Sequence, residues 1–394
     1  MRNEIDVPLC LDGRMLGHAG TGVSTYARIL QDVQRKLGVQ HGTLVADPAR
    51  LPPFLGALSR RARRARLRPA DGASFELFSQ DLFRRAHIHF GLTGKLFRVV
   101  PEIPFGIMHW TYPLPLALDG WINVYAVHDV IPITDPELSP VSPTRLRRTL
   151  VALAEVADRI VTISDASLEA ISGLNIFDRA KISNISLTTE RTNMDNAGDT
   201  RLLRSLGLNA KGFFLFSGTV EERKNIPRLL AAYERAGPEL PLVIVGPEGA
   251  DASAIEARIV CMNNVVRLPY QSKWSLDRLV ANAYAVLFPS LAEGFGLPVL
   301  EAMIRGTPVL TSKIPAIEEV AGDAALMVDP TSVADLAGGI QRLAREPMLA
   351  HDFALKGLER AEQFTVELFE QRLGHVYQTA LAEHHGPTSV TRHQ

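Results

Sequence analysis

Short apolar runs alternate along the chain with stretches in which apolar residues recur every three or four positions. A continuous apolar run of about five residues is typical of a parallel strand covered on both faces, whereas the longer periodic stretches are typical of amphipathic helices. The alternation therefore predicts βαβ units and a parallel sheet, an α/β fold. The runs expected to form strands are 7–11, 105–110, 122–127, 159–163, 181–185, 213–216, 242–246, 265–268, 285–288, 307–311 and 325–329.

One polar stretch, residues 188–200, interrupts this alternation because it lacks apolar periodicity and contains several Asn, Asp and Gly residues. We interpret it as a linker between an N-terminal domain, residues 1–187, and a C-terminal domain, residues 201–364. A length of 394 residues is sufficient for two domains of this size. A last helix is expected over residues 365–386, and residues 387–394 are expected to be a disordered tail.

Residues 287–303 predict the end of a buried strand, a glycine-bearing loop and a helix that begins at Pro298. Glycines let the backbone approach a ligand closely, and the free N–H groups at the helix start favour an anion such as phosphate. Glu293 in the loop and Glu301 in the first helical turn are separated by seven residues. Because a phosphate site has no use for a carboxylate, Glu293 is expected to contact hydroxyl groups or a developing positive charge. The anion-facing N–H groups are those of Phe295, Gly296 and Leu297.

Two further loops follow predicted strands and carry groups suited to phosphate. Arg223 and Lys224 stand side by side at a strand-to-helix junction, where they are either solvated or neutralise a diphosphate. Gly20 and Gly22 lie between the first strand and the first helix. Their spacing is neither the dinucleotide fingerprint nor a Walker loop, so they form either a tight turn or a phosphate-facing loop.

Polar residues also end the strands of the N-terminal half. His128 and Asp129 follow the apolar run 122–127, at the end of the strand where open α/β sheets bind ligands. His109 ends the preceding run. Ser164 follows a strand and opens a helix, so it is equally well explained as a helix cap or as a ligand contact.

The composition narrows the class of protein. Hydrophobic residues make up 46% of the chain and charged residues 22%, which is typical of a soluble globular protein. The net charge of −1 argues against nucleic-acid binding, and Cys10 and Cys261 suggest neither a disulfide framework nor a metal site. The sequence has no membrane-length apolar run and no signal-peptide core. These features predict a cytoplasmic enzyme.

Residues 51–86 depart from the near-neutral charge of the whole chain. The segment Arg60–Arg68 contains six arginines that do not keep to one helical face, beside apolar residues. One explanation is a solvated arginine-rich helix or mobile loop. The other is a basic, partly apolar insertion that meets anionic lipid headgroups or a diphosphate-linked lipid at the inner face of the plasma membrane. Nucleic acid ranks third because no aromatic residues are interleaved.

The segment Glu293–Glu301 resembles the E-x7-E signature of the family 4 glycosyltransferases, which are retaining, sugar-nucleotide-dependent enzymes of the GT-B fold. The segment Val127–Pro132 is similar to the V-H-D-x-x-P segment of that family, and Gly218–Asn225 to its G-T-x-x-x-R-K-N segment. The resemblance is strong over residues 200–380 and loose before them. It implies two Rossmann-like domains that face a cleft, with the C-terminal helix crossing back to the first domain. Ser186–Glu190 departs from the turn found in many members.

The resemblance also implies residue roles. Arg223 and Lys224 would bind the donor diphosphate together with the backbone of residues 295–297 and the Gly20 and Gly22 loop. Glu293 would hold the hydroxyl groups of the donor sugar. His128 would line the sugar pocket, and Glu301 would bind the ribose. The nucleoside would lie against Gly246, Pro269 and Tyr270, and the acceptor side of the cleft would contain Ser164, Asp129 and His109.

The sequence contains no Asp-x-Asp pair of the kind that holds a divalent metal on a donor diphosphate, so a metal-independent hexosyltransferase without cofactor is expected. Retention at the anomeric carbon is implied by the resemblance alone. The sequence around Glu293 and His128 is similar to that of exopolysaccharide and O-antigen mannosyltransferases, which favours GDP-mannose as donor. The acceptor expected is a polyprenyl-diphosphate-linked or other glycan in bacterial surface polysaccharide synthesis.

Three alternatives stay open. The donor can instead be UDP-glucose or another UDP-sugar. The chain can be a nucleotide-sugar-binding module without catalytic activity. The third is an NAD-type dehydrogenase built on similar layered sheets, although the missing dinucleotide fingerprint and the Glu293 and Glu301 pair argue against it.

Overall fold

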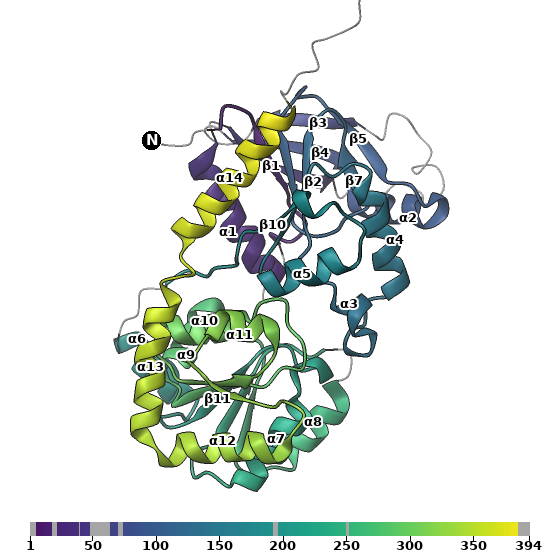
Figure 1. The fold of residues 1–394 in the computed structure, drawn as a ribbon. Coiled ribbons are helices and arrows are strands. Elements are labelled where there is room, and N and C mark those ends of the chain that lie inside the picture. The colour runs from purple at the N-terminus through teal and green to yellow at the C-terminus, as the bar shows by residue number, and fades with distance from the viewer. Residues whose placement is uncertain are drawn as a thin grey trace, which may run out of the picture.

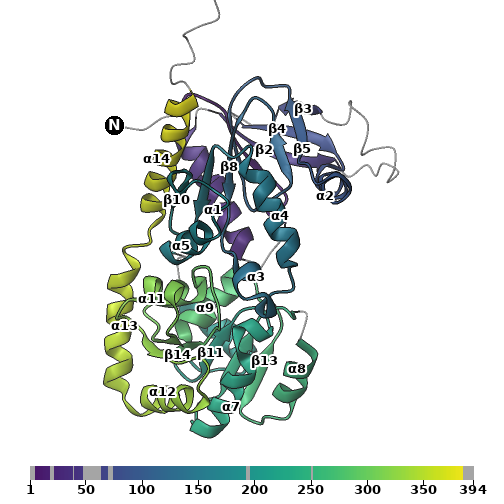
Figure 2. The same cartoon turned by 45° about the vertical axis from the view of Figure 1, so that its right-hand side comes forward.

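A computed structural model of the chain describes residues 5–17, 22–38, 40–47, 64–69, 74–191, 196–249 and 252–384. The chain forms two α/β lobes stacked on one another, with the last two helices running along one side of both lobes (Figures 1 and 2). The predicted α/β fold class with parallel sheets is confirmed. Gly20 and residues 387–394, for which the sequence made predictions, lie outside the described residues.

The described part of the first lobe holds a ten-stranded sheet in the order β10-β9-β8-β6-β1-β2-β4-β3-β5-β7. Its pairings are parallel except for the antiparallel pair β3 and β4. The strands are β1 (Leu9–Asp12), β2 (His41–Asp47), β3 (Arg64–Pro69), β4 (Ser74–Gln80), β5 (Phe97–Pro101), β6 (Ile107–Trp110), β7 (Leu116–Leu118), β8 (Ile122–Ala126), β9 (Arg159–Thr162) and β10 (Ile182–Asn184).

The central strands are apolar at successive positions because helices cover both faces of the sheet. In β1, Leu9 and Leu11 pack into one core cluster, while Cys10 between them packs into the other. Side chains that alternate between two buried faces explain why this strand shows no polar alternation. The helices of the lobe are α1 (Gly22–Leu37), α2 (Leu82–Thr93), α3 (Ile131–Thr134), α4 (Pro143–Ala154) and α5 (Asp165–Gly173), with 3-10 turns at Pro136–Leu138 and Arg179–Lys181.

The arginine-rich segment differs from the expectation where the structure describes it. Residues 64–69 form neither a helix nor an irregular loop but strand β3, and β4 pairs with β2 inside the main sheet. In β3 Ala65 is buried, whereas Arg64, Arg66, Leu67 and Arg68 are exposed, so the strand shows no regular burial period and is defined by its pairing with β4 and β5. Arg60 and Arg61 lie outside the described residues.

The second lobe contains a six-stranded, fully parallel sheet in the order β13-β12-β11-β14-β15-β16. Its strands are β11 (Phe214–Ser217), β12 (Leu242–Val245), β13 (Val265–Leu268), β14 (Ala285–Phe288), β15 (Val309–Ser312) and β16 (Leu326–Val328). The helices are α6 (Asn196–Ser205), α7 (Ile226–Ala236), α8 (Ala252–Val260), α9 (Lys273–Asn282), α10 (Leu297–Ile304), α11 (Pro315–Ala321), α12 (Val333–Arg345) and α13 (Pro347–Ala361), with a 3-10 turn at Glu222–Lys224.

Helix α6 begins inside the stretch that the sequence indicated as an irregular linker. The part of α6 inside that stretch contains no large apolar residue, and the leucines that pack it onto the core, Leu202 and Leu203, follow residue 200. Within the stretch, Asp199 forms an ion pair with Arg278 of α9 at 3.1 Å and accepts a hydrogen bond from Asn282 at 3.0 Å. Apolar periodicity therefore could not reveal where this helix begins.

The last helix, α14 (Val366–His384), returns to the first lobe and packs beside α1 (Figure 1). Phe369, Leu373 and Tyr377 are buried there among residues of α1 and the sheet. Within the described residues, no helix is both long and apolar enough to cross a bilayer.

Candidate active site

A cavity of about 570 Å³ lies between the two lobes. The first lobe contributes residues that follow its central strands, and the second lobe contributes the loops after β11, β12, β13 and β14. Parallel strands present their carboxyl ends at one edge of a sheet, so both sheets direct their loops into the same space. The predicted residues that line it are Gly22, His128, Asp129, Arg223, Lys224, Gly246, Tyr270, Glu293, Phe295, Gly296, Leu297 and Glu301.

Glu293 is held between two cations. Its carboxylate accepts a hydrogen bond from the Lys224 ammonium at 2.5 Å and one from the Arg223 guanidinium at 3.2 Å. Arg223 also pairs with Glu221 at 2.7 Å. The side chains of Lys224 and Glu293 are about one-tenth exposed, so this ion pair is largely withdrawn from water. The loop that carries Glu293 is thereby fixed to the loop after β11.

Burial and charge act in opposite directions on this group. Burial alone raises the pKa of Glu293, but the charges of Lys224 and Arg223 outweigh it, and the pKa lies below its ordinary value. Burial lowers the pKa of Lys224, and the attraction of Glu293 offsets this only in part. Glu293 is therefore an ionised carboxylate and a weak base at neutral pH.

Glu301 forms a second, separate ion pair. It accepts from Lys273 at 2.8 Å, and Lys273 also contacts Asp277 at 2.7 Å. Asp277 in turn pairs with Arg305 at 2.5 Å. Helix α10 begins at Leu297, one residue earlier than predicted, so Glu301 is its fifth residue rather than part of the first turn. The carboxylate remains on the cavity wall.

The loop before α10 depends on its glycines. Gly296 has φ 105°, and a Cβ there would lie 2.3 Å from a side-chain carbon of Ile317. It is the N-cap of α10, and no side chain caps the helix start. Pro298 has no N–H and Val299 N donates to Gly296 O at 2.9 Å, so the N–H groups that would face an anion are those of Phe295, Gly296 and Leu297, and their role in phosphate binding stays a prediction.

His128 points its Nε2 atom at the Thr111 carbonyl oxygen, 2.8 Å away. A carbonyl oxygen only accepts, so Nε2 carries the proton and Nδ1 is the free acceptor of a neutral ring. Burial lowers the pKa of His128, although the Thr111 contact and the Asp129 charge oppose this. Burial likewise raises the pKa of Asp129, against the hydrogen bond from Ile131 N.

Three predicted residues do not line the cavity. His109 is fully buried, with Tyr26 and Tyr377 hydroxyls each 2.7 Å from its ring nitrogens. Ser164 accepts from Ser167 N as the cap of α5 and donates to Gly294 O at 2.6 Å, so it joins the lobes. Pro269 precedes the cavity residue Tyr270 but is not itself in the wall.

The sequence reasoning missed several polar groups of the cavity wall. Lys273 is the most important because it neutralises Glu301, and it lies in the first turn of the helix that follows β13. Its position after a strand was the available signal. Glu221, Thr25 and the exposed Arg28 also line the cavity. Nothing in their local sequence distinguishes them from solvated residues.

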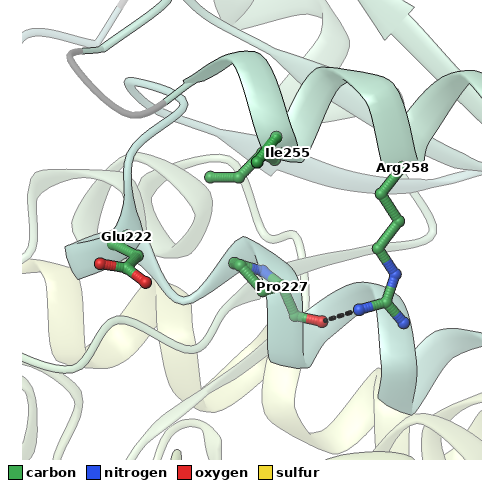
Figure 3. A pocket seen from close by; sticks show the side chains of 5 residues that line it. Glu222, Pro227, Ile255 and Arg258 are labelled. Carbon is green, nitrogen blue, oxygen red and sulfur yellow. Dashed lines mark hydrogen bonds between the residues drawn. The ribbon is translucent and has the colours of Figure 1, made fainter.

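A smaller hollow of about 330 Å³ lies in the second lobe, between the start of α7 and α8, and shares no residue with the cleft cavity (Figure 3). Arg258 donates to Pro227 O across it at 3.2 Å. Among the residues that the structure describes, no group of three or more His, Cys, Asp or Glu side chains is placed to hold a metal ion.

The family model described as glycosyl transferases group 1 matches residues 200–360. O-antigen chain mannosyltransferase B of Escherichia coli is 31% identical over 264 residues, which span 64% of this chain and 69% of that protein. The chain belongs to the group 1 glycosyltransferases. Serotype-specific mannosyltransferase WbdA of Escherichia coli is 30% identical over 245 residues, 56% of this glycosyltransferase but only 30% of WbdA. The chain thus spans under a third of that longer relative.

Solved structures agree with the GT-B fold of this glycosyltransferase. Sucrose-phosphate synthase from Thermosynechococcus elongatus superposes with a TM-score of 0.72 at 20% identity, over 96% of this chain and all of that one. Anabaena HepE in complex with UDP-glucose superposes with a TM-score of 0.66 at 16% identity, over 95% of this chain and all of that one. At these identities the likeness concerns the fold.

Proposed function

We propose that this chain is a retaining hexosyltransferase that moves mannose from GDP-mannose to a polyprenyl-diphosphate-linked or other glycan acceptor in surface polysaccharide synthesis. One observation carries the proposal: the inter-lobe cavity is lined both by Glu293 with Lys224 and Arg223 and by the separate pair of Glu301 and Lys273. Cations, free helix N–H groups and two separate carboxylates are the groups that a diphosphate flanked by two sugars requires.

In the proposed arrangement the donor diphosphate lies against Arg223, Lys224 and the N–H groups that start α10. Negative charge grows on the diphosphate as the bond from the anomeric carbon to the phosphate oxygen breaks, and preorganised cations and N–H groups stabilise that charge. Glu301 would accept from the ribose hydroxyls, and Gly246 and Tyr270 would lie beside the nucleoside. Lys273, already paired with Glu301, would hold that carboxylate in place.

Glu293 and His128 would contact the donor sugar. Both Glu293 oxygens are occupied by cations and its pKa is lowered by them once burial is overcome, so it is poorly suited to act as a base. The neutral His128 ring offers Nδ1 as an acceptor for a sugar hydroxyl. Because Glu293 is held by two cations, we propose attack from the face that the diphosphate leaves and not a covalent intermediate on this carboxylate. The acceptor oxygen bonds to the anomeric carbon, and the departing phosphate oxygen takes its proton.

The mannosyl donor is supported by the names of the relatives, which include O-antigen chain mannosyltransferase B and WbdA of Escherichia coli. The second donor candidate, a UDP-sugar, is supported by the fold neighbour HepE, whose solved complex contains UDP-glucose. A screen of nucleoside diphosphate release from GDP-, UDP- and ADP-sugars in EDTA separates these proposals. Release from a UDP-sugar but not from GDP-mannose would overturn the donor assignment, and activity only with added metal would overturn the metal-independent mechanism.

The exposed Arg64, Arg66 and Arg68 of β3 support a proposed contact with an anionic membrane surface. Sedimentation with vesicles that contain anionic lipid, compared with neutral vesicles, tests it. Equal recovery with both vesicle types would contradict the contact.

A further inference from the structure

Two arginines converge on one histidine in the first lobe. The Arg14 guanidinium lies 3.0 Å from His87 Nε2, and the Arg145 guanidinium lies 3.2 Å from His87 Nδ1. Arg14 follows β1, His87 belongs to α2 and Arg145 belongs to the first turn of α4. Three separate elements therefore bring two cations onto one small ring.

This arrangement leaves a donor without an acceptor. A neutral imidazole has one ring nitrogen that accepts and one that carries a proton, so it can accept from only one of the two guanidinium groups. Burial together with the Arg14 and Arg145 charges lowers the pKa of His87 to about 4, which keeps the ring neutral at physiological pH. In either tautomer one arginine N–H faces another N–H.

Carboxylates do not resolve the conflict within the described residues. Neither Arg14 nor Arg145 forms an ion pair there, whereas Arg84 and Arg98 of the same lobe pair with Asp81 and Asp119. Asp12 exerts a negative field on Arg14, but it accepts backbone N–H groups of Thr111 and Arg14 instead. The two guanidinium forks thus retain donors for an anion.

Arg14 lies just past the carboxyl end of β1, and none of the three residues belongs to the lining of the cleft cavity. Arg14 lies over the ring of Tyr112, 5.7 Å from its centroid. The preceding residue, Thr111, accepts the Nε2 hydrogen bond of His128. A ligand anchored at the cluster can therefore extend along Tyr112 towards the sugar pocket.

We propose that Arg14, His87 and Arg145 form an anion site that binds the phosphate or diphosphate group of the glycosyl acceptor. The identity of the ligand as the glycosyl acceptor rests on the proposed function, because the cluster itself indicates only an anion of phosphate geometry. Two guanidinium groups can each donate paired N–H···O hydrogen bonds to phosphate oxygens. The anion thereby supplies the hydrogen-bond acceptor that the imidazole cannot supply to both arginines.

The direct test follows the ring signals of His87 by NMR in histidine-labelled full-length protein as pyrophosphate is added. The signals are assigned by their loss in His87→Asn. We expect them to shift in wild type, with a midpoint about tenfold or more higher in Arg145→Ala, because a charged hydrogen-bonding partner is lost. Arg147→Ala is the matched control, since Arg147 is exposed on the same helix and makes none of these contacts.

Arg14→Lys is the second variant, because it keeps the charge and the partly buried stem but loses the fork. It is expected to weaken pyrophosphate binding less than Arg145→Ala does. Equal midpoints in all variants, or His87 signals that stay fixed while pyrophosphate is added, would overturn the site. Since this readout needs no donor, its outcome is independent of whether the glycosyltransferase proposal holds.

Transfer assays then distinguish the source of the phosphate. A soluble sugar phosphate, a lipid-linked diphosphate sugar in detergent and the same sugar without phosphate are compared as acceptors. Wild type should show a KM about tenfold lower for one of the phosphate-bearing acceptors, and Arg145→Ala should remove that advantage. A preference for the lipid-linked form assigns a lipid diphosphate, and one for the soluble form assigns a sugar phosphate. No preference for either overturns the acceptor assignment.

Discussion

The two carboxylates of the E-x7-E segment occupy different electrostatic environments, although they are only eight positions apart in the sequence. Glu293 neutralises Lys224 and Arg223, the cations assigned to the diphosphate, whereas Glu301 neutralises Lys273. The pattern in the sequence located both residues in one site. It could not show that each has its own cation, because the pairing depends on loops that are distant along the chain.

Glu293→Ala should reduce turnover more than donor affinity. The variant removes the sugar-contacting carboxylate but frees two cations for the diphosphate, so we expect kcat to fall about a hundredfold while the donor dissociation constant stays close to that of wild type. Arg223 keeps Glu221 as a partner, which limits structural loss. Calorimetric donor titration and initial rates measure the two quantities.

Glu301→Ala should show the opposite order of effects. Loss of the proposed ribose acceptor is expected to weaken donor binding about tenfold before it affects kcat. Lys273 retains Asp277, so the helix is not left with an unpaired cation. Glu222→Ala is the control for both variants because Glu222 is exposed and outside the cleft cavity. Similar kinetic profiles for the two active-site variants would contradict the division of roles.

Asp12 provides a pH-dependent prediction at the same scale. Burial raises its pKa from 3.8 to about 6, against the hydrogen bonds from Thr111 and Arg14. A folded-state pKa above the unfolded value means that the folded state binds the extra proton, so this group's contribution to stability is present below pH 3.8 and is lost as the pH rises to about 6. The loss amounts to about 3 kcal/mol.

Urea unfolding at pH values on both sides of 6 measures this contribution. The unfolding free energy of wild type should fall relative to that of Asp12→Asn as the pH rises through this window, because the variant cannot ionise. Asp32→Asn, at a half-exposed position on α1, is the control and should track wild type. Parallel pH profiles for wild type and Asp12→Asn would show that the prediction is wrong.

At the scale of elements, the crossover helix α14 is joined to the first lobe by a buried polar network. The Tyr377 hydroxyl lies 2.7 Å from His109 Nδ1 and accepts from Gln34 Nε2 at 2.9 Å. His109 contacts Tyr26 in turn, and the Tyr26 ring packs edge-on against His128 at 4.7 Å between centroids. The crossover therefore supports, through Tyr26, the His128 part of the cleft cavity wall.

Tyr377→Phe should destabilise the protein because it leaves the His109 and Gln34 polar atoms buried without this partner. We expect the unfolding free energy to fall by about 1–3 kcal/mol. Chemical denaturation measures it, with Tyr270→Phe as a control at an exposed tyrosine that is 45% accessible. Equal losses in both variants would mean that the buried network contributes nothing specific.

Elements whose burial follows a simple period were predictable, and those fixed by other contacts were not. Strands β12 and β14 could be located because they are apolar runs buried at every position, whereas β13 contains Arg267 and is only half-buried. The start of helix α6 was missed since its first turn carries Asp199, which pairs with Arg278, while its core leucines follow residue 200. Strand β3 was missed since it offers no apolar period: the buried Ala65 stands among exposed arginines and the exposed Leu67. His109 was assigned to the cleft because the sequence shows that it ends a strand. The sequence does not show that its partner is Tyr377, more than two hundred positions away.

At the scale of the whole molecule, the loop that carries Glu293 is also part of the contact between the lobes. Gly294 O, next to Glu293, accepts from the hydroxyls of Ser164 at 2.6 Å and Ser167 at 3.0 Å. Glu319 of α11 accepts from the first N–H groups of α5, those of Asp165 and Ala166, at 2.8 and 3.0 Å. A carboxylate from one lobe thus caps a helix of the other, where the helix dipole favours negative charge.

Glu319→Ala should therefore loosen the two lobes without touching the cavity wall. The free α5 N–H groups return to water, so the closed arrangement loses charge-assisted hydrogen bonds and the donor KM should rise about tenfold. Small-angle scattering of the donor-free protein should show a larger radius of gyration than for Glu318→Ala, whose exposed carboxylate is one residue away. If both variants scatter like wild type while KM rises in Glu319→Ala alone, the carboxylate acts on the donor site and not through lobe closure.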